Sequence, residues 1–247
     1  MNIAITGAEG FIGTYLVNLL KEKKGFNMFF FDRTKHNLFD SSSLEEFVSN
    51  KEVIIHLAAV NRDRDMAIIA GSVCTTYNLI LAMKKVESKA KVIFASSIQA
   101  ETESVYGLSK RLVEIMLRDL SEDLKIPVTV LRIANVFGEG CRPFYNSVVA
   151  TFCYQVAHGK EIDIIKDRKI NFIYVDDVVN GIFKEIIERG DELFCLKTLI
   201  SENTLLVSEL AEIVMSFKEL DFLGQVPKFE SKFQRDLYAT YLSYGKG

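Results

Sequence analysis

The sequence predicts an α/β fold, a doubly wound parallel sheet with helices on both faces, followed by a small C-terminal subdomain. Short apolar runs alternate with stretches of helical spacing through the first half of the chain. This order is typical of parallel strands joined by right-handed crossovers. The chain also opens on a strand that leads through a glycine-rich turn into a helix. Both features favour one large α/β unit.

Strands are predicted where apolar runs are short, and helices where apolar residues recur every three or four positions. The expected strands of the sheet are Asn2–Thr6, Asn27–Phe31, Val53–Leu57, Lys91–Ala95 and Val128–Ile133. The expected helices between them are 11–23, 42–49, 68–85 and 104–120. Ser42 caps the second helix, and Gly71 marks an irregularity in the third. The strand 27–31 is apolar after Asn27, so we expect it to be buried on both faces, with Phe29 and Phe30 in the core.

The alternation loosens after Ala134. The expected helices there are 146–157, 175–188, 207–217 and 229–244, and the expected strands are 162–165, 170–174 and 194–196. We expect residues 1–160 to form the core and residues 161–247 mainly to form a subdomain that is interleaved with it. Parallel α/β sheets bind ligands at the carboxyl ends of their strands, so this later material is suited to hold a substrate there.

Composition bounds the function. The 247 residues are 49% hydrophobic and 26% charged with a net charge of -3, which argues against a nucleic-acid partner. Four cysteines form no C-x-x-C pair, and no His, Cys, Asp and Glu set has metal-ligand spacing, so we expect reduced thiols and no metal. No apolar run reaches about 18 residues, and the N-terminus leads directly into a strand. We therefore expect a cytoplasmic protein with no membrane partner.

Three glycines of the opening turn predict a phosphate site. Gly7 permits a tight turn, Gly10 lets backbone approach a phosphate, and Gly13 permits close packing of the helix on the strand. The helix that begins at Phe11 and Ile12 offers free N–H groups and partial positive charge to a pyrophosphate. An ordinary strand-to-helix turn is the alternative. The turn makes residues 1–160 a candidate Rossmann-like, dinucleotide-binding core.

The residues after the second strand bear on the cofactor. Asp32 stands where a carboxylate accepts hydrogen bonds from an adenosine ribose, which favours NAD. Arg33 stands where a guanidinium binds a 2′-phosphate, which favours NADP. Asp40 either contacts the adenine or is solvated in its loop. The residues leave both cofactors open.

Tyr106 and Lys110 predict a proton-handling group. Residues four apart on a helix share one face, so the phenol and the ammonium can point into one site. A free tyrosine has a pKa of about 10, and a nearby ammonium favours the tyrosinate form. Ser97 ends a strand upstream and can donate a hydrogen bond to a substrate carbonyl. His56 ends a buried strand, and we expect it to be structural.

These motifs resemble the extended short-chain dehydrogenase/reductase family of nucleotide-sugar epimerases, dehydratases and reductases. The pieces in family order are T-G-A-E-G-F-I-G, His56–Ala59, Ser96–Ser97, Tyr106-x-x-x-Lys110, Arg132–Gly138 and Tyr174–Asp177. The resemblance implies Ser97, Tyr106 and Lys110 as catalytic residues and Asn135 as a substrate contact. It implies Leu57, Ala58 and Ala59 beside the cofactor. It also favours NADP over NAD.

A narrower resemblance is to the reductase half of bifunctional capsular-polysaccharide enzymes that end in a zinc cupin. It is carried by His56–Arg62, Ser97–Ala100, Tyr145–Tyr154 and Asp236–Tyr244. It implies NADPH-dependent reduction of the C4 ketone of a UDP-2-acetamido-2,6-dideoxyhexos-4-ulose, for a capsular or surface polysaccharide. The chain stops about where a cupin begins, so a stand-alone reductase and a fragment both remain open.

The chain departs from the family pattern at three places. Ser72 stands where the family often has Asn, in the active-site helix bend. A diphosphate-binding Arg is replaced near Ile170, and Arg142 and Arg168 are candidate substitutes. Ile98 and Gln99 occupy the positions of the dehydratase acid pair, which argues against dehydration.

Three functions remain open from the sequence: a 4-ketoreductase, a 4-epimerase that retains NAD, and a non-catalytic nucleotide-binding domain. The intact Ser97, Tyr106 and Lys110 favour the first two over the third, since a sensor needs no acid-base set. Helices beside the sheet, including the one that carries Tyr106, suit a two-fold interface, so we expect a homodimer.

Overall fold

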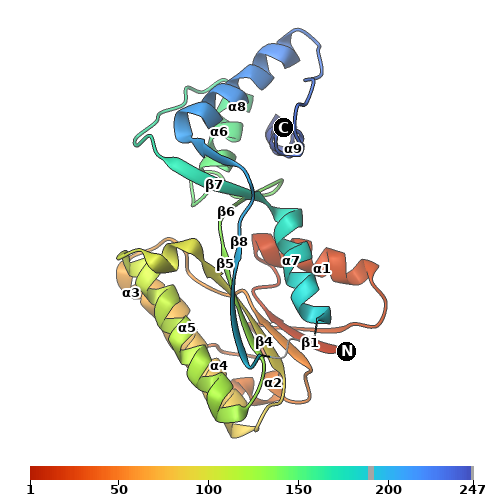
Figure 1. Ribbon diagram of the computed structural model, residues 1–247, viewed down its shortest axis with the longest axis vertical. Helices are drawn as coiled ribbons and strands as arrows, with labels where there is room; N and C mark the ends of the chain where they lie inside the picture. The colour runs from red at the N-terminus through yellow and green to blue at the C-terminus, as the bar shows by residue number, and fades with distance from the viewer. Residues whose placement is uncertain (189–191, 246–247) are drawn as a thin grey trace. The chain divides into compact units, whose positions relative to one another are not determined.

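The computed structural model describes residues 1–188 and 192–245 (Figure 1). The chain forms two compact units. The first contains residues 1–133 and 179–199, and the second contains residues 134–178 and 200–247. Residues 134–160, which we expected to be part of the core, belong to the second unit. The substrate-binding role of residues 161–247 stays a prediction.

The first unit is built on a six-stranded parallel sheet. Its strands are β1 (Asn2–Thr6), β2 (Asn27–Phe30), β3 (Val53–His56), β4 (Lys91–Ser97), β5 (Val128–Ile133) and β8 (Phe194–Leu199). Their order is β2-β1-β3-β4-β5-β8, and every neighbouring pair is parallel. The predicted parallel α/β sheet is confirmed. All five of its expected strands form, within two residues of the predicted bounds.

Helices cover both faces of this sheet. On one face lie α1 (Phe11–Glu22) and the later turns of α7 (Val175–Ile187) (Figure 1). On the other, α4 (Thr75–Lys85) packs against α2 (Glu45–Val48) and α5 (Val105–Leu124), and α5 also packs against α3 (Asp65–Ile69). Short turns η1 (Ser42–Leu44) and η3 (Ile98–Glu101) precede α2 and α5. The apolar core between α4, α5 and the sheet includes Leu79, Met83, Phe94, Val113 and Leu117.

A π-helical turn, η2 (Ala70–Cys74), joins α3 to α4. A Cβ on Gly71 would lie 2.2 Å from Val60 Cγ2, so the backbone passes too close to Val60 for a side chain. The predicted irregularity at Gly71 is confirmed. Within the described residues, the stretch Asp65–Lys85 alone meets the length and hydropathy expected of a membrane span. Its apolar window is 44% buried, and core helices meet the same criterion, so this stretch is weak evidence for a membrane span.

Two strand predictions are wrong. The strand 27–31 is not buried on both faces, because β2 pairs only with β1 and lies at the sheet edge. Phe29 and Phe30 are 43% and 42% exposed. Residues 162–165 form no strand, and Ile165 is 95% exposed. The segment 162–165 contains Asp163 among three isoleucines, and a short run of this kind gives a strand only where a neighbouring strand supplies its hydrogen bonds.

The second unit has its own small sheet and core. Strand β7 (Lys169–Tyr174) pairs parallel with β6 (Asn135–Phe137) and antiparallel with β9 (Thr204–Leu206). Helices α6 (Val148–Ala157), α8 (Val207–Phe222) and α9 (Lys232–Gly245) pack together. Their core includes Phe152, Phe172, Leu210, Phe233 and Leu237.

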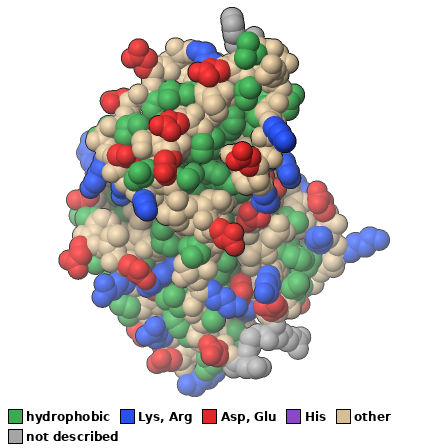
Figure 2. Space-filling model, turned by 45° about the horizontal axis from the view of Figure 1, so that its top comes forward, with side chains coloured by type: hydrophobic (Ala, Val, Ile, Leu, Met, Phe, Trp, Pro, Cys, Tyr) green, Lys and Arg blue, Asp and Glu red, His purple; other side chains and the backbone are tan. Residues whose placement is uncertain are grey.

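The surface carries charges of both signs. Figure 2 shows Lys and Arg side chains interspersed with Asp and Glu over the face in view, with hydrophobic side chains between them. This distribution agrees with the small net charge of -3. No basic stripe of the kind that follows a nucleic-acid backbone crosses that face.

Candidate active site

The glycine turn after β1 has no room for side chains at Gly7 and Gly13. Gly7 has φ +72, and a Cβ there would lie 2.8 Å from Ala58 N. A Cβ on Gly13 would lie 2.1 Å from Gly7 O, because the first turn of α1 packs directly on the strand end. Gly10 is the N-cap of α1 and has no side chain over the helix terminus. Phe11, Ile12 and Gly13 begin the helix, so their N–H groups suit an anion.

A series of buried, hydrogen-bonded polar side chains connects this turn to the neighbouring strand and helix. Ala58 N donates to Thr6 Oγ1 at 3.2 Å, and Thr6 Oγ1 lies 2.7 Å from His56 Nδ1. His56 Nε2 lies 2.9 Å from Thr76 Oγ1, which donates to Ser72 O at 2.7 Å. Burial, aided by the Lys110 charge, lowers the pKa of His56 to about 3, so the ring is neutral. One order of donors satisfies every atom: Thr6 donates to Nδ1, and Nε2–H donates to Thr76.

This arrangement makes His56 a structural residue that ties the ends of β1 and β3 to α4. Leu57 N donates to Thr6 O at 3.2 Å, which extends the contact between the two strands. Leu57, Ala58 and Ala59 are half-buried, and the backbone of Leu57 and Ala58 lies beside Gly7, where the resemblance expects cofactor contacts.

Asp32 and Arg33 follow β2, at the same end of the sheet as the glycine turn. Asp32 Oδ1 accepts hydrogen bonds from Thr34 N at 2.8 Å and Thr34 Oγ1 at 2.7 Å. These bonds lower the pKa of the Asp32 carboxyl below its usual value. Asp40 uses its Oδ1 in the same way for Ser42 N and Oγ. Both carboxylates therefore organise their own loops, and the choice between NAD and NADP stays open.

The predicted catalytic residues lie at the end of β4 and the start of α5. Ser97 ends β4 and accepts a hydrogen bond from Gln99 N at 3.1 Å, which caps η3. Ser104 caps α5 by accepting from Gly107 N at 3.0 Å. A Cβ on Gly107 would lie 2.1 Å from Gln99 O, so η3 and α5 pack directly on each other. Ser97 and the first turns of α5 are thereby held together.

Tyr106 and Lys110 occupy successive turns of α5. Lys110 Nζ lies 5.8 Å from the centre of the Tyr106 ring and 4.9 Å from that of Phe94. It donates to Ala95 O at 2.9 Å, two residues before Ser97. Lys110 is only 3% exposed, and burial lowers its pKa to about 8, while the Glu114 carboxylate acts in the opposite direction. The structure thus brings Lys110 to the strand that carries Ser97.

The buried hydroxyl of Ser72 lies on the π-helical turn, near the other end of the series of hydrogen bonds through His56. Within residues 1–188 and 192–245, its Oγ is the one buried side-chain oxygen or nitrogen that has no hydrogen-bond partner. Ser72 is where the family often has Asn, so the departure leaves an orphaned donor in the helix that packs on α5.

The candidate substrate residues belong to the second unit. Asn135 begins β6 and donates through Nδ2 to Asn171 O at 3.3 Å. Arg142 is exposed, with its guanidinium 5.3 Å from the centre of the Tyr145 ring. Arg168 is exposed directly before β7. The contacts of Asn135 and Arg142 do not involve each other, and the role of all three residues stays a prediction.

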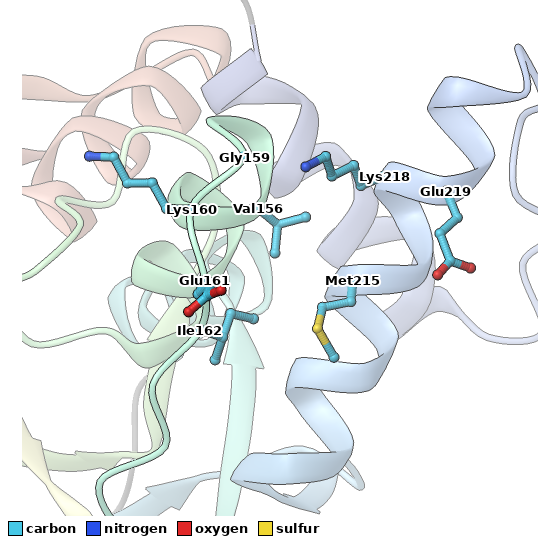
Figure 3. A pocket seen from close by; sticks show the side chains of 8 residues that line it. All are labelled: Val156, Gly159, Lys160, Glu161, Ile162, Met215, Lys218 and Glu219. Atoms are coloured by element: carbon cyan, nitrogen blue, oxygen red, sulfur yellow. The ribbon is translucent and has the colours of Figure 1, made fainter.

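A cavity of about 490 Å³ lies within the second unit, between the end of α6, the loop after it and α8. Val156, Ile162 and Met215 lie toward its middle, while Lys160 and Glu219 point outward on opposite sides (Figure 3). None of the predicted site residues lines it. No group of three metal-ligating side chains is found among the described residues.

Sequence reasoning missed one set of residues. Glu114, four positions after Lys110, is buried and accepts hydrogen bonds from Ser96 and Arg132. The four-residue spacing from Lys110 was a visible signal, because it puts both side chains on one helix face.

These features define an α/β protein with a glycine turn after its first strand, and with Ser97, Tyr106 and a buried Lys110 at the end of β4 and the start of α5. The chain belongs to the NAD dependent epimerase/dehydratase family, whose model matches residues 3–192. The family resemblance drawn from the motifs is confirmed.

Two relatives cover nearly the whole chain. A UDP-2-acetamido-2,6-beta-L-arabino-hexul-4-ose reductase of Pseudomonas aeruginosa is 35% identical over 246 residues, which are 99% of this chain and 65% of that protein. The crystal structure of the capsular polysaccharide assembling protein CapF from Staphylococcus aureus matches with a TM-score of 0.80 at 31% identity, over 99% of this chain and 65% of that one. The chain therefore spans slightly less than two thirds of both relatives.

A more distant structure shares the fold. RMD from Pseudomonas aeruginosa, complexed with NADPH, matches with a TM-score of 0.81 at 18% identity, over 99% of this chain and 98% of that one.

Proposed function

We propose that this chain uses NADPH to reduce the 4-keto group of a UDP-2-acetamido-2,6-dideoxyhexos-4-ulose, in the synthesis of a capsular or surface polysaccharide precursor. One observation carries the proposal: Lys110 bonds to the strand that ends in Ser97 and lies one turn from Tyr106. The 35% identical reductase, which is named for a 4-keto sugar of this kind, supports the substrate class.

Each residue has a distinct role in the proposed reaction. A bound reduced nicotinamide supplies the hydride that reduces C4 of the sugar. The Tyr106 hydroxyl donates the proton that the C4 oxygen takes up, so the ketone becomes an alcohol. Lys110 holds the nicotinamide ribose, and its positive charge stabilises the tyrosinate that remains. Ser97 donates a hydrogen bond to the C4 oxygen and polarises it.

The segment after Ser97 argues against dehydration. Ile98 and Gln99 stand where dehydratases of the family carry an acid pair, and both lie in η3. Their side chains offer no carboxyl to protonate a leaving C6 hydroxyl. A reduction or an epimerisation needs none.

The cofactor is proposed to be NADPH, with NAD(H) as the alternative. The glycine turn, whose Cβ positions at Gly7 and Gly13 collide with backbone, suits the pyrophosphate. Arg33 is proposed to bind the 2′-phosphate, since Thr34 occupies one oxygen of Asp32. Asn135, Arg142 and Arg168 are proposed as substrate contacts. We also propose that the protein is cytoplasmic.

Turnover of an authentic UDP-4-keto sugar tests the function. Purified protein should consume NADPH stoichiometrically, with the loss of absorbance matched to formation of the C4 alcohol by NMR. Tyr106→Phe should lower turnover by at least about 100-fold while NADPH binds as before, because only the proton donor is lost. Titration with NADPH and NADH, with Arg33→Ala as a control, measures the preference.

Two other outcomes would point to the alternatives. Protein that carries NAD through purification and interconverts C4 epimers without added NADPH would be a 4-epimerase. Protein that binds the nucleotide but leaves every UDP-4-keto sugar unchanged would be a non-catalytic domain, and the reductase proposal would fail.

We also propose a homodimer through α4 and α5. Leu108, Leu112 and Ile115 form one exposed apolar face of α5, and Tyr77 and Leu81 are exposed on α4 beside it. Two copies of this helix pair would make a four-helix interface. Leu112→Glu should convert a dimer in analytical ultracentrifugation into a monomer; a monomeric wild type at micromolar concentration would contradict the proposal.

A further inference from the structure

Glu114 is a buried carboxylate at the centre of a hydrogen-bonded cluster beside Lys110. It is 5% exposed. Its Oε1 accepts from Ser96 Oγ at 2.5 Å and from Arg132 Nε at 3.1 Å, and its Oε2 accepts from Arg132 Nη2 at 2.7 Å. Two parallel bonds between a guanidinium and a carboxylate fix both groups in one plane. A buried carboxylate is stable only with partners of this kind.

The cluster joins the three segments that form the candidate active site. Ser96 and Arg132 face each other in the register of β4 and β5, and Ser96 directly precedes Ser97. Glu114 lies on α5, one turn after Lys110. Arg132 Nη1 also donates to Glu101 at 2.8 Å, at the end of η3. The strand end, the turn after Ser97 and the helix are therefore fixed to one another.

The charges that face Lys110 and Glu114 come from four elements. Glu114 on α5 is the buried anion, Arg132 on β5 is paired with it, and His56 on β3 is neutral. Glu101 on η3 pairs with Arg132 from the solvent side, with its side chain 73% exposed. Tyr106 is the remaining titratable group of the site on α5. The Glu114 carboxylate is thus the buried negative charge nearest to the Lys110 ammonium along the helix.

We infer that Glu114 is a positioning residue for the proposed reaction: held by Arg132 and Ser96, it supplies the counter-charge that keeps Lys110 an ammonium and fixes Ser97 relative to the Tyr106 helix. The part of this inference that concerns catalysis rests on the proposed function. The direction of the electrostatic effect agrees with the geometry, since burial lowers the Lys110 pKa and Glu114 raises it.

Glu114→Gln removes the charge but keeps an oxygen that accepts from Ser96 and Arg132. Without the anion, Lys110 loses its proton at lower pH. The alkaline limb of the kcat profile should move down by at least about one pH unit, so that turnover on that limb falls roughly tenfold, with little change in NADPH affinity at pH 6. Glu101→Gln is the matched control, because it takes an exposed carboxylate from the same arginine. The alkaline limb of the kcat profile of Glu101→Gln should lie at the same pH as that of the wild type.

Arg132→Gln separates charge from structure. It breaks the same cluster but leaves the Glu114 carboxylate, so its alkaline limb should lie at or above that of the wild type even if turnover falls. If Glu114→Gln does not fold, the position of the alkaline limb in Arg132→Gln tests the inference. A downward shift in Arg132→Gln equal to that of Glu114→Gln, or no shift in Glu114→Gln, would overturn the inference.

A second readout needs no substrate. In apo protein, urea unfolding followed by circular dichroism between pH 6 and pH 10 reports the Lys110 titration, and Glu114→Gln should move it to lower pH. If the wild type reduces no UDP-4-keto sugar but this shift is seen, the proposed function fails and the electrostatic role of Glu114 stands. If the wild type is active and neither readout moves, the inference fails and the proposed function stands.

Discussion

Lys110 should make the stability of the apo protein rise with pH in the alkaline range. The side chain is 3% exposed, and burial holds its pKa at about 8, against 10.5 for an ordinary lysine. Because the folded pKa is lower, the unfolded chain binds more protons than the folded chain between pH 8 and pH 10.5. Stability therefore increases across this window, and the cost of burying the ammonium is fully present below pH 8.

Lys110→Met isolates this effect, because methionine fills similar space and does not titrate. The difference between 10.5 and about 8, at 1.36 kcal/mol for each pH unit, gives a cost of about 3 kcal/mol for the buried ammonium. About 2.5 kcal/mol of it should disappear between pH 7 and pH 10. At any one pH, loss of the bond to Ala95 O offsets part of the gain, by about 1–3 kcal/mol. Loss of this bond has the same effect at every pH, so it does not alter how the stability difference between Lys110→Met and the wild type changes with pH.

Urea unfolding of nucleotide-free protein, followed by circular dichroism at several pH values, measures this difference. The advantage of Lys110→Met over the wild type should shrink by about 2.5 kcal/mol from pH 7 to pH 10. Lys21→Met, at an exposed lysine, corrects for the general loss of one positive charge. A difference that stays constant over this range would show that the folded protein does not lower the Lys110 pKa, and the reasoning would be refuted.

Three further outcomes follow from the same structure. Ser104→Ala should cost about 1 kcal/mol in urea unfolding, since it removes the N-cap of α5, and an unchanged midpoint would contradict this. Gly13→Ala should abolish NADPH binding in a fluorescence titration, because its Cβ would lie 2.1 Å from Gly7 O, whereas Gly245→Ala, with open space around it and no positive φ, should bind normally. His56, whose pKa burial lowers to about 3, should cost the wild type about 3 kcal/mol of stability between pH 7 and pH 4; His56→Leu should flatten that acid loss, and an equally steep loss would count against a neutral His56.

The sequence was sufficient for features that depend on local pattern. Apolar runs of five or six residues between amphipathic helices predicted the strands of the main sheet and their parallel direction. Gly71 predicted the irregular turn, because a glycine inside a helical pattern weakens the helix at that point. The four-residue spacing of Tyr106 and Lys110 predicted a shared helix face, and the structure puts both at the start of α5.

Features that depend on neighbouring strands were not predictable in this way. The run 27–31 is as apolar as a central strand, yet β2 lies at the sheet edge because no described strand follows it on that side. Residues 162–165, three isoleucines with Asp163 between them, form no strand. Strands β6 and β9 have three residues each, and they form because β7 offers an edge on both sides. Whether a short apolar run becomes a strand was decided by its partners.

The charge state of the candidate active site shows the same limit. A lysine four residues after a tyrosine says nothing about its protonation, because that depends on groups from other elements. Phe94 and Ala95 bury Lys110, and this burial lowers its pKa. The Glu114 carboxylate acts in the opposite direction and partly stabilises the ammonium. Glu114 in turn is held by Arg132, 18 residues further along the chain, on a strand whose register with β4 sets Ser96 opposite. The acid-base chemistry proposed for Tyr106 thus depends on strand register, and a one-residue shift of β5 would leave the Glu114 carboxylate without its arginine.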